Sequence, residues 1–142
     1  MHTLKDTAKI ILSRTGIRNP FNKLFKVVEF ETTAYCNRKC EYCPNADFER
    51  FGGEDNFFMN EKVFYELINQ LEALNYSGLI SPHLYGEPMS DHRMLDWSSH
   101  IKKKLPHSKL KIVTNGDFLN IKNFNEFLEA GVDIFYISKH AK

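Results

Sequence analysis

Alternating apolar and polar residues recur along the chain and predict four short β-strands. In the first strand Val28, Phe30 and Thr32 would share one face, while Glu29 and Glu31 would share the other, because successive side chains of a strand point to opposite faces. The predicted strands are residues 27–32, 79–85, 110–114 and 133–138.

The second predicted strand carries polar residues on one face. Ser81, His83 and Tyr85 alternate with apolar neighbours and would lie on the same side of the strand. A polar face on a strand that helices flank would line a cavity. We therefore expect substrate contacts at His83, and also at Tyr136 and Ser138 of the last strand.

Between the strands, apolar residues spaced three or four positions apart predict three amphipathic helices. The apolar face of the first helix consists of Phe64, Leu67, Ile68, Leu71 and Leu74. Side chains suited to helix capping precede the three helices, at Asn60, Asp91 and Asn120. Gly131 would end the third helix. A further short helix is predicted within residues 1–24.

The alternation of strands with helices predicts an α/β fold with a parallel sheet and right-handed crossovers. It leaves open whether the sheet is an open doubly wound sheet or part of a barrel. In both folds, ligands bind at the carboxyl ends of the strands. Three segments that carry candidate functional residues follow the first three strands, at residues 33–59, 86–88 and 114–116. We therefore predict that they form one shared site.

Composition and charge indicate one folded domain and exclude several classes of function. The chain has 142 residues, of which 42% are hydrophobic and 26% are charged, a composition that can form a core. Its net charge of +1 does not favour binding to nucleic acid or to an anionic membrane. No apolar run approaches the roughly twenty residues of a membrane span, and the first residues do not form a secretory signal. We expect a cytoplasmic protein.

All three cysteines of the chain, Cys36, Cys40 and Cys43, lie within eight positions with the spacing C-x3-C-x2-C. An odd number so close together makes a poor disulfide framework and favours zinc or an iron–sulfur cluster. A structural zinc ion needs four ligands, and the nearest histidines, His83 and His92, lie beyond a helix. Three thiolates suit three irons of a four-iron cluster whose fourth iron is open. A zinc site completed by a partner or a histidine is the alternative.

With these residues the sequence resembles the radical SAM superfamily, whose signature is C-x3-C-x2-C after the first strand of a partial (β/α)6 barrel. Asn37 and Tyr42 also fit that signature. Residues 85–88 resemble the family's Gly-Gly-Glu-Pro segment, and residues 114–116 are a frequent family feature. The segment that follows the cysteines resembles the SPASM-type group, which modifies peptides or proteins.

The resemblance implies a 4Fe–4S cluster held by Cys36, Cys40 and Cys43, with S-adenosyl-L-methionine (SAM) on the open iron. Such an enzyme cleaves SAM reductively to a 5′-deoxyadenosyl radical that abstracts a substrate hydrogen. Flavodoxin or ferredoxin is the implied electron donor, and a peptide or protein is the expected substrate. The residues implied around SAM are Tyr42, Gly86, Glu87, Pro88, Thr114, Asn115 and Ser138. Glu87 is expected to bind the SAM ammonium, and no catalytic residue is identified.

The sequence departs from the family in the size of its barrel. The family has six βα units, whereas this chain supplies about three and a half. We interpret residues 1–24 as a lead-in helix and residues 25–142 as the N-terminal portion of a radical SAM core, a partial TIM-type barrel that is truncated. The alternatives are a noncatalytic zinc-binding interaction module and an inactive truncated fragment.

Overall fold

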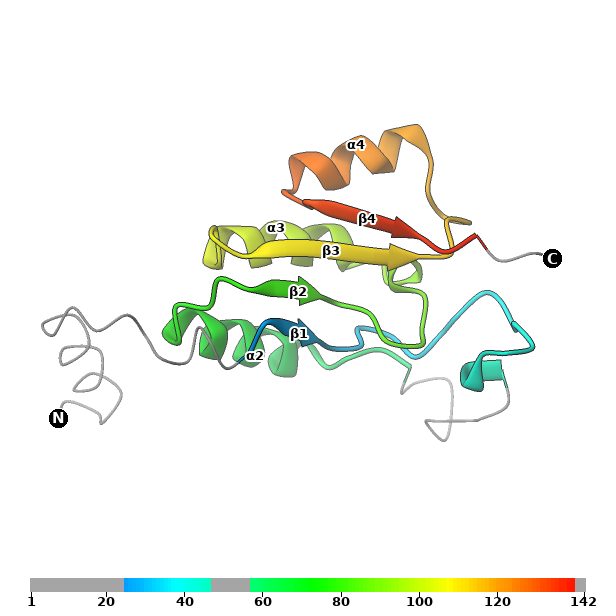
Figure 1. Cartoon of the computed structure of the whole chain (residues 1–142), viewed down its shortest axis with the longest axis horizontal. Helices are drawn as coiled ribbons and strands as arrows, with labels where there is room; N and C mark the ends of the chain where they lie inside the picture. The colour runs from blue at the N-terminus through cyan, green and yellow to red at the C-terminus, as the bar shows by residue number, and fades with distance from the viewer. Residues whose placement is uncertain (1–24, 47–56, 140–142) are drawn as a thin grey trace, which may run out of the picture.

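A computed structural model describes residues 25–46 and 57–139, which form one parallel sheet with helices packed against it. The strands lie in the order β1-β2-β3-β4, and each pairs in parallel with the next. Their bounds are Val27–Glu29 (β1), Leu79–Ser81 (β2), Lys109–Thr114 (β3) and Ile134–Ile137 (β4). Figure 1 shows that all four carboxyl ends point the same way. The predicted α/β class is confirmed, and the helix predicted within residues 1–24 lies outside the described residues.

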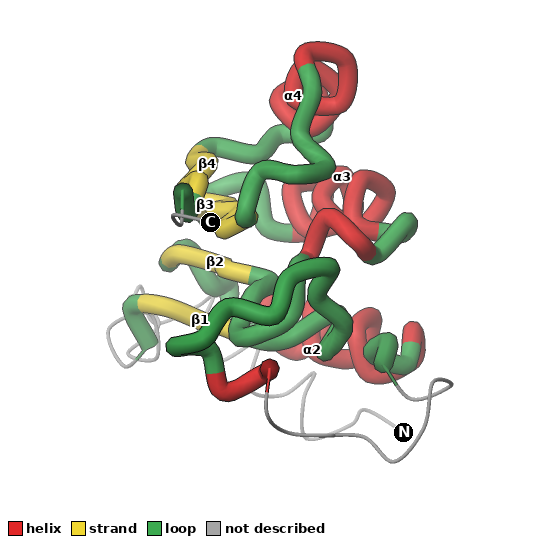
Figure 2. The backbone as a smooth tube through the Cα atoms, turned by 90° about the vertical axis from the view of Figure 1, so that its right-hand side faces the viewer, coloured by secondary structure: helices red, strands yellow, loops and turns green. Residues whose placement is uncertain are grey.

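The helices lie on one face of this sheet, as Figure 2 shows. Their bounds are Glu61–Ala73 (α2), Met94–Lys104 (α3) and Ile121–Glu129 (α4), and two short 3-10 helices span Pro44–Ala46 (η2) and Pro88–Ser90 (η4). Doubly wound sheets carry helices on both faces, whereas a barrel has them only outside. The one-sided cover therefore favours a barrel segment. Within the described ranges, no helix has the length and apolar character needed to cross a membrane.

The core lies between the sheet and the helices. The rings of Phe64 from α2 and Trp97 from α3 are stacked, with centroids 3.9 Å apart and planes 4° apart. Ile80, Leu110 and Ile112 are fully buried and supply the apolar face of the sheet. This packing fixes β2 and β3, two of the strands whose carboxyl ends carry predicted site residues.

Three of the predicted helix boundaries are confirmed and one is wrong. Asn60 accepts a hydrogen bond from the Lys62 N–H at the start of α2, and Asn120 forms a capping box at the start of α4. Gly131 follows α4 with φ +93°, a left-handed conformation that glycine adopts without strain. Asp91 does not cap α3, which begins after Arg93, because its carboxylate instead binds the Arg93 guanidinium and N–H.

Two predicted strands end earlier than their alternation indicates. The first strand ends at Glu29 rather than at residue 32, and the second ends at Ser81 rather than at residue 85. Further along, a side chain rather than the main chain joins the two segments. The Tyr85 and Gly86 N–H groups donate to the Glu31 carboxylate at 2.9 and 2.8 Å. The segments therefore open into loops at the carboxyl edge of the sheet.

Gly86 is the point at which the turn after β2 approaches the loop after β1 most closely. A Cβ atom there would lie 1.8 Å from the Thr33 carbonyl oxygen and 3.0 Å from that of Tyr35. We predict that Gly86→Ala lowers the free energy of unfolding by at least about 2 kcal/mol, because backbone must move to admit the methyl group. Urea unfolding measures this loss, with the exposed Ser99→Ala as control. Equal stability of the two variants would contradict the prediction.

Asp133 joins α3 and β3 to the start of β4 through Lys102, Lys109 and the Leu110 N–H. Although burial raises the pKa of this carboxyl, those three hydrogen bonds lower it to about 2. The stabilisation is therefore present above the unfolded pKa of about 3.9 and is lost as the pH falls towards 2.

We predict that Asp133→Asn lowers the free energy of unfolding at pH 7 by about 1 kcal/mol, a modest value because solvent screens the partly exposed pairs. The difference from the unsubstituted chain should shrink steadily between pH 4 and pH 2. Urea unfolding across this range measures it, with the exposed Asp96→Asn as control. A difference that does not change with pH would show that the carboxylate charge is not the cause.

Candidate active site

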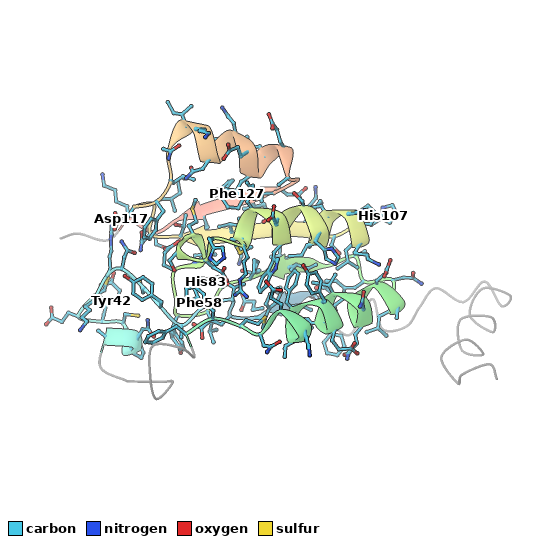
Figure 3. All side chains as sticks on the ribbon, turned by 180° about the vertical axis from the view of Figure 1, so that it is seen from behind. Tyr42, Phe58, His83, His107, Asp117 and Phe127 are labelled. Carbon is cyan, nitrogen blue, oxygen red and sulfur yellow. The ribbon has the colours of Figure 1, made fainter. Side chains whose placement is uncertain are left out.

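The predicted site residues meet in one pocket at the carboxyl edge of the sheet. The pocket has a volume of about 130 Å³ and is lined by the loop after β1, the turn after β2, the end of β3 and the residue after β4. Figure 3 shows Tyr42, on the loop after β1, and Asp117, on the loop after β3, at the same end of the molecule. The predicted residues in its wall are Cys36, Cys40, Tyr42, Cys43, Gly86, Glu87, Thr114, Asn115 and Ser138. Pro88 is not in the wall and is buried at the start of η4.

The three cysteines are free thiols, each partly exposed, on the loop between β1 and η2. A tight turn separates the last two, since the Cys43 N–H donates to the Cys40 carbonyl at 2.9 Å. The Cys36 Sγ accepts from the Arg38 N–H at 3.5 Å and from the Asn115 amide at 3.9 Å. Burial raises the pKa of the Cys36 thiol, and these two donors oppose that rise.

This donor set fits an iron–sulfur cluster better than a single metal ion. In residues 25–46 and 57–139, no three His, Cys, Asp or Glu side chains converge so as to hold one ion, although His83 lines the same pocket as the cysteines. A structural zinc ion requires four converging ligands. In a cluster each thiolate binds a different iron, so the thiolates need not converge on one point. The three cysteines would each supply one thiolate to such a cluster.

Glu87 lies at the centre of the site and is 3% exposed. Its Oε1 accepts from the Thr114 hydroxyl at 2.7 Å and from the Met89 N–H at 3.0 Å, while its Oε2 accepts from the Asn115 N–H at 2.8 Å. Its own N–H donates to the Tyr35 carbonyl at 2.8 Å. One carboxylate thus connects the turn after β2 with the end of β3. An ionised carboxylate has about four acceptor positions, and the hydrogen bonds from residues 25–46 and 57–139 leave one of those on Oε2 for a ligand.

Glu31 is a site residue that the sequence pattern did not single out. Its carboxylate holds the Tyr85 and Gly86 N–H groups and so fixes the turn that carries Glu87. The alternation placed it with Glu29 on the polar face of the first strand. The acidic face lies beside a predicted ligand site and could have drawn attention to Glu31. The hydrogen-bond partners of Glu31 are more than fifty residues away in sequence, so the local pattern could not identify them.

Arg38 and Asp117, which the sequence pattern did not single out, join the cysteine loop to the loop after β3. The Arg38 guanidinium binds both carboxylate oxygens of Asp117, with its Nε 2.7 Å from Oδ2. The Asn37 amide donates to the same Oδ2 at 2.8 Å and accepts from the Asn115 amide at 2.8 Å. The hydrogen bond to Asp117 raises the pKa of Arg38. The loops are therefore joined by side chains about eighty residues apart in sequence.

Of the residues expected near a substrate, His83 and Ser138 line the pocket and Tyr136 does not. Tyr136 lies on β4 with 62% of its surface exposed. Burial lowers the pKa of His83, and the charge of Lys111 acts in the same direction, whereas that of Glu29 opposes it. His83 lines the same pocket as the three cysteines.

Known proteins resemble the chain over most of its length. The sequence model of the Radical SAM superfamily matches residues 30–141. The S-adenosyl-L-methionine-dependent 2-deoxy-scyllo-inosamine dehydrogenase of Niallia circulans is 34% identical over 120 residues, which are 84% of this chain and 47% of that protein. The tungsten-containing aldehyde ferredoxin oxidoreductase cofactor-modifying protein of Pyrococcus furiosus is 30% identical over 115 residues, which are 80% of this chain and 30% of that protein.

Two solved structures share the fold. The crystal structure of BtrN in complex with AdoMet and 2-DOIA matches with a TM-score of 0.77 and 33% identity, over 83% of this chain and 47% of that one. The structure of BtrN in an open conformation matches with a TM-score of 0.74 and 32% identity, over 82% and 51%. The chain thus spans about half the length of these structures.

These matches confirm the expected family and, with it, the expected types of cofactor, a 4Fe–4S cluster and SAM. They also confirm the partial barrel, because 83% of the chain matches a solved radical SAM fold with a TM-score of 0.77. The narrower SPASM-type resemblance stays a prediction. By its sequence, its fold and the cysteine loop at the carboxyl edge of its sheet, the chain belongs to the radical SAM superfamily.

Proposed function

We propose that the chain binds a 4Fe–4S cluster through Cys36, Cys40 and Cys43 and presents its open iron to SAM, as part of a radical SAM enzyme. The observation that carries the proposal is that all three cysteines line one pocket with Gly86 and Glu87 at the carboxyl edge of the sheet. When bound, the reduced cluster and SAM supply a 5′-deoxyadenosyl radical that abstracts a substrate hydrogen.

The side chains around the pocket would bind and orient SAM. The Glu87 carboxylate suits the SAM ammonium because its donors within the described part of the chain leave one acceptor position, and a charge-assisted hydrogen bond is stronger than a neutral one. Tyr42, on the loop after β1, and Ser138, just after β4, both line the pocket. Tyr42 is the proposed contact for the adenine of SAM, and Ser138 is the proposed contact for its ribose. Thr114 and Asn115 hold Glu87, so they would act on SAM mainly by fixing that carboxylate.

We also propose a substrate class and an electron donor for the reaction. A peptide or protein is the substrate expected from the SPASM-type resemblance. A small hydroxylated molecule is the second candidate, because one relative is named as a dehydrogenase of 2-deoxy-scyllo-inosamine. His83 and Ser138, which line the pocket, are the proposed substrate contacts. Flavodoxin or ferredoxin is the proposed reductant, and the cytoplasm is the proposed location.

Replacing one cysteine tests the cluster. After anaerobic reconstitution the unsubstituted chain should hold about four irons and four sulfides and absorb broadly near 400 nm, whereas Cys40→Ala should lose most of both. Iron and sulfide counts and the optical spectrum measure this. Lys39→Ala, an exposed neighbour on the same loop, is the control and should load fully. A colourless chain that keeps zinc would favour the zinc-binding module, and a chain that keeps neither metal would favour an inactive fragment.

Replacing the central carboxylate tests SAM binding. Glu87→Gln should weaken SAM binding to the reconstituted chain by about tenfold or more, because a charged acceptor is lost. Equilibrium dialysis with labelled SAM measures the affinity, and the iron count shows that the cluster is retained. The exposed Asp96→Asn is the matched control. Unchanged affinity in a fully loaded Glu87→Gln variant would rule out the proposed contact with the ammonium.

A further inference from the structure

The side-chain amide of Asn115 has a fixed orientation at the end of β3. Its Oδ1 accepts from the Asp117 N–H at 2.9 Å, and a backbone N–H can only donate, so the oxygen must lie on that side. Its Nδ2 therefore points towards the cysteine loop. There it donates to the Asn37 Oδ1 at 2.8 Å and to the Cys36 Sγ at 3.9 Å.

The Arg38–Asp117 pair maintains this arrangement. Asp117 accepts from the Asn37 amide and from the Arg38 guanidinium, so Asn37 is held where it can accept from Asn115. The two charged side chains are 25% and 38% exposed, and ion pairs at such exposure add little stability. Their bidentate geometry nevertheless fixes direction, because the planar guanidinium matches a carboxylate only in a narrow range of orientations.

Donors to a ligand sulfur raise the reduction potential of an iron–sulfur cluster, because they stabilise the additional negative charge of the reduced state. We infer, on the basis of the proposed function, that the Asn115 amide is such a donor to Cys36 and raises the potential of the cluster, and that Arg38 and Asp117 are positioning residues for it. The Arg38 N–H, 3.5 Å from the same sulfur, is a second donor.

Asn115 also connects the cluster ligand to the SAM site through its main chain. Its backbone N–H donates to the Glu87 Oε2 at 2.8 Å, while its side chain reaches Cys36. A side-chain substitution removes the second contact and leaves the backbone donor for the first. The effects on the cluster potential and on SAM binding can therefore be separated at this position.

The test compares Asn115→Ala and Asp117→Asn with the unsubstituted 142-residue chain, all reconstituted anaerobically with iron and sulfide. The reduction potential is measured by spectroelectrochemistry without SAM. At a fixed solution potential, Asn115→Ala should lower the ratio of reduced to oxidised cluster about threefold. This corresponds to a shift of the reduction potential by about 30 mV to more negative values. Asp117→Asn should shift it less in the same direction. Asn125→Ala on the exposed side of α4 is the control and should not shift it.

Each outcome decides a different claim. An unchanged potential in a fully loaded Asn115→Ala chain would overturn the inference and leave the proposed function standing. If Asn115→Ala loses its cluster, Asp117→Asn decides, and an unchanged potential there would likewise overturn the inference. Failure of the unsubstituted chain to take up iron and sulfide would overturn the proposed function and the inference together.

Discussion

The buried carboxylate of Glu87 fixes the edge of the sheet on which the candidate site is built. Three donors from two segments, Thr114, Asn115 and Met89, converge on it, and it is almost wholly shielded from water. A buried carboxylate of this kind is stable only because its hydrogen bonds replace those of water. The turn after β2 and the end of β3 are therefore fixed relative to each other before any ligand binds.

Side chains also determine the position of the cysteine loop, which has little secondary structure of its own. The loop is attached on one side by Asn37 and Arg38, which reach Asn115 and Asp117 beyond β3. On the other side, the main chain of Tyr35 accepts from the Glu87 N–H. The loop thus contacts both the turn after β2 and the loop after β3, which gives three thiolates a defined place beside the proposed SAM site.

Local rules predicted the order of the elements and the convergence of three segments on one edge. Helix capping is a local interaction, so Asn60 and Asn120 could be identified from their neighbours alone. The cap expected at Asp91 was wrong because a competing partner, Arg93, lies two residues away. Glu31 and the Arg38–Asp117 pair depend on contacts between distant segments, which the period of a strand or helix does not encode. The family resemblance identified the cysteines and the Gly-Glu-Pro turn but not the side chains that support them.

In the proposed site, three thiolates bind three irons and leave the fourth to SAM. The most direct measurement is the Mössbauer spectrum of the chain reconstituted with ⁵⁷Fe, recorded before and after SAM is added. About one iron in four should change its isomer shift on SAM binding while the other three do not. Four irons that all remain unchanged when SAM is present in excess, or iron that never assembles into a cluster, would contradict it.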